Sequence, residues 1–388
     1  MTVQSPIPIE EFVKSTTAFG QTVALPPKCF WDPEFYRFEL DAVWGHDWFC
    51  IGRVTDIPDS GDFYTIIVGN EPLLIVRQQD GTVRVLSNVC QHRGQLLAEG
   101  SGNFQRIRCP MHSWVYELTG ALTFAPGFDD DPTFEIGEVC LPEIRSEVWE
   151  GFLFVTFDDS IPALVGRLVK LKDQLANYRL SQLRAYVPLE PEHNDWNWKM
   201  YADECYHCTY LHARSFGKMF PVPPSAVDED CEYNDAENGI MAYELIGQHA
   251  DASPTRTGKA LHPILPDLTE RQRSRMAYIM VAPNLLIVAM PDKVKYWVWL
   301  PAGPTASFLG VSWAFPESTL ADPGFVERWE MEKEDLHSTV IEDLEGWKRY
   351  QVGIESRFAP RGRLSNLEKT IGRLQDWLVR RYQAAVEQ

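Results

Sequence analysis

The sequence lacks an excess of basic residues. Lysine and arginine number 36 against 55 aspartate and glutamate residues, so the formal net charge is −19. A field of this sign repels phosphate backbones and anionic lipid headgroups. The composition therefore disfavours a nucleic-acid partner and a membrane-surface role.

A long hydrophobic run and an export leader are also missing. The longest apolar stretch, Met276 to Met290, has 15 residues and includes Pro283 and Asn284, which is too short to span a bilayer. Glu10 and Glu11 stand where a signal or transit peptide needs basic residues. We therefore expect a soluble cytoplasmic protein.

Cysteine is sparse for a chain of this size, with eight residues among 388. The cysteines are unevenly spread and follow no export signal, so we expect thiols or metal ligands rather than disulfides. A G-x-G-x-x-G fingerprint after a strand, the usual sign of a dinucleotide site, is missing as well. The sequence also contains no internal repeat and no coiled-coil heptad run.

The sequence does have the composition of a folded protein. Hydrophobic residues make up 45% and charged residues 23% of the chain, both close to globular averages. Its length corresponds to two or three domains. From Trp48 to Phe157, short apolar runs alternate with turns, and Asp80-Gly81 between two runs predicts a hairpin. We expect an all-β module with strands at 48–54, 62–69, 72–78, 82–89, 104–109 and 151–157.

The pattern changes after about Pro162. We expect helices at 164–178, 194–212, 322–356 and 364–388, and an antiparallel meander at 285–290, 295–301 and 308–315. Strands and helices that do not alternate as βαβ units indicate an α+β fold. We expect three parts, which are an N-terminal segment 1–44 that packs on the last domain, the β module 45–160, and a domain 161–388.

Two loops of the β module each carry one cysteine and one histidine. They are Cys90-Gln91-His92-Arg93-Gly94 and Cys109-Pro110-Met111-His112. A zinc finger groups two cysteines and then two histidines, whereas each half is mixed here. Two such loop tips can approach a binuclear cluster with both sulfurs on one iron and both imidazoles on the other, which is Rieske [2Fe–2S] ligation. A structural zinc site and a chance clustering are the alternatives.

A second group of metal-binding residue types follows Asn197. His207 and His212 are five residues apart, or about 140° around an ideal helix, so the helix must end or bulge between them if both bind one ion. The H-E-x-x-H motif of zinc proteases keeps both histidines on one face, so this is a different kind of site. Two imidazoles suit iron, copper, nickel or zinc, and a third ligand must decide among them.

Asp343 is a candidate for the third ligand. With Leu336, Val340 and Trp347 it falls on one apolar stripe of a predicted helix, where a buried carboxylate without a partner is unfavourable. Metal coordination would offset that cost, and two histidines with one aspartate form the facial triad of non-haem Fe(II) oxygenases. An ordinary surface acid on a slightly rotated helix is the alternative.

Both groups resemble motifs of the ring-hydroxylating oxygenase α subunits. The run CQHRG…CPMHSWVY resembles their Rieske motif C-x-H-R-G…C-P-x-H-x-W-x-Y, with Ser113 in place of the usual glycine. His-x4-His, followed by Asp343 and Gln351-Val352-Gly353, resembles their catalytic domain, and the resemblance covers the chain from about residue 30. It implies a [2Fe–2S] cluster bound by Cys90, His92, Cys109 and His112, and a mononuclear Fe(II) bound by His207, His212 and Asp343.

The resemblance also implies a bridging acid before His207. In the family, an acid joins the iron site to a Rieske histidine of a neighbouring subunit, because a carboxylate accepts an imidazole N–H from each side. Glu204 occupies this position, where aspartate is commoner, and the stretch from Asn197 to His207 is shorter than usual. We favour Glu204 over Asp203, since a residue three before His207 lies closer to it around a helix.

The resemblance implies the terminal oxygenase of a multicomponent system, with a helix-grip-like catalytic domain. Its expected partners are a separate flavin-containing reductase that oxidises NAD(P)H, with or without a ferredoxin, and two more copies in a homotrimer. We expect mono- or dioxygenation of an aromatic or cyclic substrate. Oxidative N- or O-dealkylation, for example of a quaternary or methylated amine, is the alternative reaction. A Rieske electron carrier with a non-catalytic second domain is the rival class of protein, and it would hold no mononuclear iron.

Overall fold

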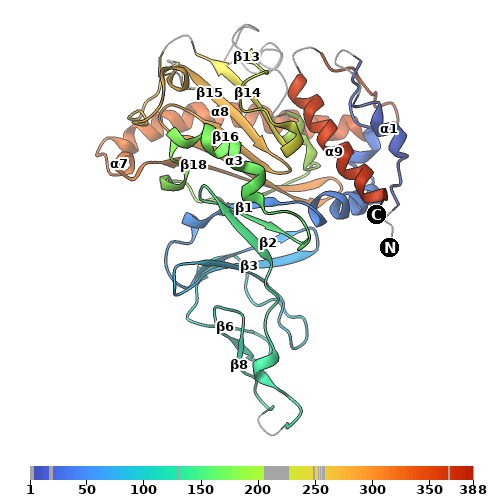
Figure 1. Cartoon of the computed structure of the whole chain (residues 1–388), viewed down its shortest axis with the longest axis vertical. Helices are drawn as coiled ribbons and strands as arrows, with labels where there is room; N and C mark the ends of the chain where they lie inside the picture. Colours follow the sequence, from blue (N-terminus) through green and yellow to red (C-terminus); the bar gives the residue numbers. More distant parts are fainter. Residues whose placement is uncertain are drawn as a thin grey trace.

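The computed structural model describes residues 4–16, 21–128, 131–204, 227–247, 250–251, 253, 255, 258–365 and 368–387, and within these ranges it leaves out the side chains of 202–204 and 334–343. Figure 1 shows a wide upper body, built of a large sheet and helices, and a narrow lower part that tapers to strands β6 and β8. The predicted α+β fold is confirmed.

The narrow part contains small antiparallel sheets. One has the strand order β4-β3-β2-β5, a second has the order β6-β7-β8, and a third has the order β1-β10-β9. Figure 1 places β1 at the junction with the upper body. The strands are β1 Phe49–Arg53, β2 Asp62–Val68, β3 Glu71–Arg77, β4 Val83–Ser87, β5 Ser101–Asn103, β6 Ile107–Arg108, β7 Val115–Tyr116, β8 Leu122–Phe124, β9 Arg145–Trp149 and β10 Phe152–Thr156.

The predicted Asp80-Gly81 turn connects β3 to β4. Gly81 has a φ of +83°, a conformation that glycine adopts without the steric penalty of a Cβ, and the N–H of Gln78 donates to the carbonyl of Thr82 at 2.8 Å. The strand expected at 104–109 is shorter than predicted. Only Ile107–Arg108 pairs with β7, because the chain turns into a tight loop at Cys109.

The upper body is built on one antiparallel sheet with the strand order β11-β18-β17-β16-β15-β14-β13, and β12 also pairs with β18. Side chains alternate between its faces, as the period of a strand requires. Tyr296 and Val298 of β17 lie in one core, and Trp297 and Trp299 lie in the other. The strands are β11 Arg184–Ala185, β12 Glu192–Asn194, β13 Val227–Asp228, β14 Ile240–Ile246, β15 Arg275–Val281, β16 Leu285–Ala289, β17 Val294–Gly303 and β18 Ala306–Phe315.

Helices cover both faces of this sheet. The face of Tyr296 packs against α3 Leu164–Gln174 through leucines spaced three or four residues apart, Leu164, Leu168 and Leu171. The face of Trp297 packs against α8 Phe325–Ile354 and α9 Lys369–Glu387. The other helices in the described part of the chain are α1 Ile9–Val13, α2 Pro33–Glu39, α4 Lys199–Glu204, α6 Glu270–Arg273 and α7 Glu317–Leu320.

Three helices start later than the sequence predicts, since α8 begins at Phe325 and α9 at Lys369, and α4 differs most in its physical cause. The helix expected from residue 194 begins at Lys199, because residues 192–194 form β12 and pair with β18. Asn197 caps the helix, since its side-chain Oδ1 accepts the N–H of Lys199 at 3.0 Å. The predicted part beyond Glu204, which includes the expected bulge between His207 and His212, lies outside the described residues.

A side-chain amide joins the β module to the upper body. Asn284, which is fully buried, accepts the N–H of Cys50 at 2.8 Å and donates to the carbonyl of Cys50 at 2.7 Å. Its Nδ2 also donates to the carbonyl of Trp299 at 2.9 Å. The amide therefore pairs with β1 as a neighbouring strand would, while it remains tied to β17.

The N-terminal segment brings a buried acid to the start of α4. Glu39, at the end of α2, accepts from Lys199 Nζ at 2.7 Å, from Trp198 Nε1 at 2.8 Å and from Tyr382 Oη at 2.5 Å. Both Glu39 and Lys199 are almost completely shielded from solvent. Their ion pair and its hydrogen bonds join α2, α4 and α9 in one core.

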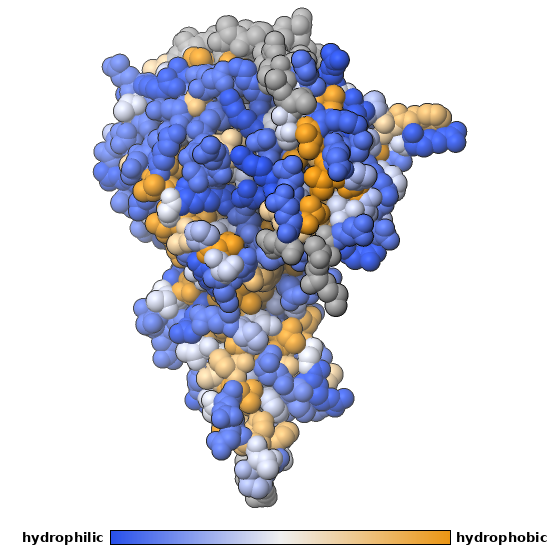
Figure 2. Space-filling model, turned by 45° about the vertical axis from the view of Figure 1, so that its right-hand side comes forward, coloured by the Kyte–Doolittle hydropathy of each residue, from blue (hydrophilic) through white to orange (hydrophobic). Residues whose placement is uncertain are grey.

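The surface is mostly polar over the wide body, with apolar patches that include part of the narrow end (Figure 2). In the β module the exposed large apolar side chains are Ile67, Met111, Phe124, Ile136 and Val148. Among the described residues, no helix combines the length and the apolar character that crossing a bilayer would require.

Candidate metal centres

The two Cys-His loops share one backbone conformation. In the first loop the carbonyl of Cys90 accepts the N–H of Gly94 at 3.0 Å, and the N–H of Cys90 donates to the carbonyl of Gln95 at 2.8 Å. In the second loop Cys109 makes the same two bonds, with Ser113 at 3.1 Å and with Trp114 at 2.8 Å. The two loops therefore share one pattern of backbone hydrogen bonds, although their histidines stand two and three positions after the cysteine.

Each loop needs a left-handed residue four positions after its cysteine. Gly94 has a φ of +77° and Ser113 has a φ of +60°. Glycine adopts this conformation freely, whereas a residue with a Cβ is strained in it. Ser113, the departure noted in the sequence, therefore holds the second loop at an energetic cost.

The loops bring their four candidate ligands together. The ring centroids of His92 and His112 are 4.9 Å apart, and the thiols of Cys90 and Cys109 are buried. Trp114 stacks on His92 at 4.8 Å, with an angle of 10° between the rings. The indole thus covers one face of the imidazole.

The chemistry of these side chains fits a metal cluster. Burial is the main cause that raises the pKa of the Cys90 thiol, and the nearby Cys109 thiol raises it further. The Nδ1 atom of His92 is buried without a hydrogen-bond partner, which is unfavourable for a polar atom. A bound metal would stabilise the thiolate form of the cysteines and would give the imidazole nitrogen a partner.

These four side chains form a mixed set of metal-binding groups, with one thiol and one imidazole from each loop. In the part of the chain that the structure describes, no three His, Cys, Asp or Glu side chains lie close enough to hold one metal ion. A mixed set of this kind suits Rieske [2Fe–2S] ligation, whereas a zinc finger groups its two cysteines and then its two histidines.

The elements expected to carry the second metal site lie side by side. Helix α4 ends with Asp203 and Glu204, and Asp343 lies on the backbone of α8; the side chains of all three are outside the description, as are His207 and His212 entirely. Tyr201 of α4 contacts Trp347 of α8, with 5.0 Å between ring centroids. Trp347 is buried, as its place on the predicted apolar stripe requires.

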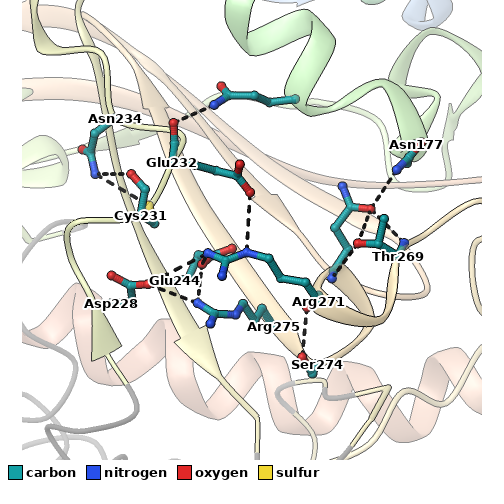
Figure 3. Close-up of polar contacts among 12 residues, drawn as sticks. Asn177, Asp228, Cys231, Glu232, Asn234, Glu244, Thr269, Arg271, Ser274 and Arg275 are labelled. Atoms are coloured by element: carbon teal, nitrogen blue, oxygen red, sulfur yellow. Dashed lines mark hydrogen bonds and ion pairs between the residues drawn. The ribbon is translucent and has the colours of Figure 1, made fainter.

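An ionic network at the β13 edge of the large sheet has a structural role (Figure 3). Glu244 accepts from Arg271 and from Arg275, both at 2.6 Å, and Asp228 accepts from Arg275 at 3.2 Å. Burial raises the pKa of the Glu244 carboxyl, and the two guanidinium groups act in the opposite direction. Because both carboxylates already pair with arginines, this cluster stabilises the edge of the sheet and does not resemble a cation site.

The contacts of two residues, which the sequence names only as members of motifs, become visible in the structure. Tyr116 contacts Cys90, with 3.3 Å between the phenol oxygen and Sγ. The amide of Gln351 contacts the N–H of Asn197. Tyr116 is the last residue of the Rieske-like motif, so the motif itself pointed to a role near the cluster. The proximity of Gln351 to Asn197, in contrast, follows only from the fold.

Comparison with known proteins defines the class of this protein. Residues 181–384 match the family model of the ring hydroxylating alpha subunit (catalytic domain), and residues 47–135 match the Rieske [2Fe-2S] domain. The chain belongs to the ring-hydroxylating alpha subunit family, whose two domains imply a Rieske cluster and a mononuclear iron. The boundaries at 44/45 and 160/161 remain predictions.

Named relatives include oxygenases of two substrate types. The chain is 32% identical over 222 residues to the glycine betaine monooxygenase oxygenase subunit of Chromohalobacter salexigens. This match covers 55% of this chain and 46% of that protein. It is 27% identical over 385 residues to the chloroplastic choline monooxygenase of Arabidopsis thaliana, covering 93% and 85%. It is 28% identical over 306 residues to the biphenyl 2,3-dioxygenase subunit alpha of Rhodococcus jostii, covering 74% and 58%. The match to several relatives, including those from Chromohalobacter and Pseudomonas, spans about half of their length.

Solved structures share the fold. The quaternary ammonium Rieske monooxygenase CntA superposes with a TM-score of 0.79 at 18% identity, covering 98% of this chain and 99% of that one. Naphthalene 1,2-dioxygenase from a Rhodococcus species gives the same TM-score and identity, covering 98% of each chain.

Proposed function

We propose that this chain is the terminal oxygenase of a multicomponent system, which uses O2 and electrons from a separate reductase to oxygenate a small organic molecule. The observation that carries the proposal is the pair of loops at Cys90 and Cys109, which share the same backbone hydrogen bonds and gather two thiols and two imidazoles in a chain of this family. A Rieske electron carrier would not need the second, larger domain.

The residues divide between two centres. A Rieske cluster would supply one-electron transfer, and a mononuclear Fe(II) with open positions would supply activation of O2. Cys90, His92, Cys109 and His112 would hold the first group, and His207, His212 and Asp343 the second. Glu204 at the end of α4, with Asp203 as the less favoured candidate, would accept an imidazole N–H from each centre and so hold both rings in place.

Electron transfer between subunits is part of this proposal. Figure 1 shows the tip with β6 and β8 at one end of the molecule and α8 in the wide body at the other, so the two proposed centres of one chain would lie apart. A structure of a quaternary ammonium Rieske monooxygenase is described in terms of inter-subunit electron transfer. A head-to-tail ring of three chains would place the tip of one chain against the body of the next. The electrons would come from a flavin-containing reductase that oxidises NAD(P)H in the cytoplasm, directly or through a ferredoxin.

We place methylated or quaternary amines first among substrates, and aromatic or cyclic compounds second. Glycine betaine, choline and carnitine monooxygenases are all among the relatives. The biphenyl and chlorobenzene dioxygenases among the relatives support the second class.

Two substitutions test the assignment of the centres. Cys90→Ala should lose the cluster together with its visible absorption, whereas His207→Ala should keep that absorption, lose the mononuclear iron and abolish oxygenation. Normal turnover by His207→Ala would contradict the mononuclear site. A purified wild-type chain with labile sulfide but no iron beyond the cluster would support the electron carrier instead.

The bridging acid and the substrate need separate measurements. Glu204→Gln should slow re-oxidation of the reduced cluster while both irons stay bound, and Asp203→Asn serves as its matched control; the reverse pattern would move the role to Asp203. Substrate-stimulated O2 uptake, measured with glycine betaine, carnitine, choline and biphenyl, decides the class. Hydroxylation of an N-methyl group would also release formaldehyde, whereas ring hydroxylation would not.

A further inference from the structure

The side chain of Gln351 connects α8 to the start of α4. Gln351 is 3% exposed. Its Oε1 accepts the backbone N–H of Asn197 at 2.9 Å, and its Nε2 donates to the carbonyl of Phe30 at 3.2 Å and to Glu355 Oε1 at 2.9 Å. One amide therefore joins α8, the cap of α4 and the short 3-10 helix η1 (Pro27–Phe30).

The partner of Gln351 is the residue that fixes where α4 begins. Asn197 is fully buried, and its Oδ1 caps the helix by accepting the N–H of Lys199 at 3.0 Å. Its Nδ2 donates to the carbonyl of Pro304 at 2.7 Å, in the turn between β17 and β18. A cap held on several sides leaves the first turn of a helix little freedom to shift.

An aromatic contact accompanies this hydrogen bond. Trp347, one turn before Gln351 on α8, lies 5.0 Å from Tyr201 and 5.9 Å from Trp196 between ring centroids. Packing of this kind brings the two elements together. A hydrogen bond has a narrow range of lengths and angles, so Gln351 provides the directional part of the contact.

The position of Gln351 relates this contact to the iron site. Asp343, Trp347 and Gln351 follow one another at four-residue steps on α8, and His207 comes ten residues after Asn197. Metal ligands must hold their distances to within about 0.2 Å. We propose that Gln351 is a positioning residue for the mononuclear iron, because it fixes the register of α8, the helix that carries Asp343, against the start of α4, the helix that leads to His207 in the sequence. This inference rests on the ligand assignment made above.

Gln351→Met is the main test. Methionine has a similar size but leaves the N–H of Asn197 and the carbonyl of Phe30 without partners. In Fe(II) titrations of the full-length, cluster-loaded protein, the affinity of the mononuclear site should fall at least tenfold, as expected for residues that orient metal ligands. The visible spectrum of the cluster should not change. Glu355→Ala is the matched control, because it removes only the partner on the surface side of the same amide, and its iron affinity should equal that of the wild type.

A double variant separates the link to Asn197 from general stability. In Gln351→Glu with Glu355→Gln, the carboxylate can still accept from the N–H of Asn197 while the pair keeps its net charge. This variant should retain iron affinity within about threefold, even if its thermal midpoint falls. If Gln351→Met does not fold, the double variant alone tests the proposal. A tenfold loss of iron affinity in the folded double variant would overturn it. Unchanged affinity in folded Gln351→Met would overturn it as well.

The same titrations distinguish this proposal from the ligand assignment. His207→Ala must abolish the mononuclear iron if His207 is a ligand. If His207→Ala binds iron normally, the ligand assignment fails. If His207→Ala loses the iron and Gln351→Met does not, only the role of Gln351 fails.

Discussion

The hydroxyl of Tyr116 lies 3.3 Å from the sulfur of Cys90. The same hydroxyl accepts the backbone N–H of Gln91 at 3.1 Å. A metal-bound thiolate has no proton, so in the loaded protein the phenol must be the donor and the sulfur the acceptor. Tyr116 is therefore oriented by one backbone group of the loop to donate to a proposed ligand in that loop.

Tyr116→Phe should lower the reduction potential of the cluster. A hydrogen bond to a ligand sulfur favours the reduced state, which carries more negative charge. A differential stabilisation of about 1 kcal/mol corresponds to about 40 mV for a one-electron couple. A redox titration followed by visible circular dichroism measures the potential. Tyr64→Phe is the control, because that hydroxyl donates to the carbonyl of Ile51. Equal potentials in the wild type and Tyr116→Phe would refute the role.

Ser113→Gly should stabilise the β module. Glycine relieves about 1–2 kcal/mol of left-handed strain at a φ of +60°, and loses part of that gain through its freer unfolded chain. We expect a net gain of about 0.5–1 kcal/mol, seen as a higher thermal midpoint for loss of the cluster absorption. Ser113→Ala keeps the strain and should not show the gain. A lower midpoint for Ser113→Gly would show that the hydroxyl contributes more than the strain costs.

Asp56 should make stability depend on pH. Burial raises the pKa of its carboxyl to about 6 from an ordinary value of 3.8. The folded state then keeps a proton that the unfolded state releases, so the free energy of unfolding falls as the pH rises from about 4 to about 6, by about 3 kcal/mol. Asp56→Asn should lose this fall and should be more stable than the wild type at pH 7. Denaturant unfolding at pH 4 and pH 7 measures the difference, with Asp59→Asn as the exposed control.

Glu39 and Lys199 should behave as a coupled pair. Glu39→Gln leaves the buried ammonium of Lys199 without its counter-charge, and we expect a loss of about 3–5 kcal/mol in the free energy of unfolding. Lys199→Met should also destabilise the fold, whereas Glu39→Gln combined with Lys199→Met should lose less than the sum of the two. A double-mutant cycle from thermal unfolding gives the coupling. Strict additivity would mean that the ion pair contributes nothing.

The features that could be predicted from the sequence are those that depend on residues close together in the chain. The hairpin at Asp80-Gly81, the strands of the meander and the two Cys-His loops all follow from residue types a few positions apart. The start of α4 could not be predicted, because the pairing of residues 192–194 with β18 overrides the helical pattern there. The expected strand at 104–109 is short for a related reason, since the loop that holds Cys109 uses backbone groups that a strand would need.

Contacts between residues far apart in the chain could not be predicted from the local sequence pattern. Asn197 and Gln351 are 154 positions apart, and Glu39 meets Lys199 across 160 positions. Amides and carboxylates of this kind usually lie at the surface, so no local signal marks them as buried partners. The mononuclear ligands remain predictions for a different reason, because they rest on motif spacing and family membership alone.

The amide of Asn284 has a practical consequence for protein engineering. Because it completes the backbone pairing of β1 from the other domain, the two halves do not end where the sequence motifs end. A chimaera that takes the cluster-bearing half from a relative can keep this pairing, because Asn284 binds only the backbone groups of residue 50. Such a graft should therefore depend on the asparagine at position 284 of the recipient body and tolerate a different side chain at position 50.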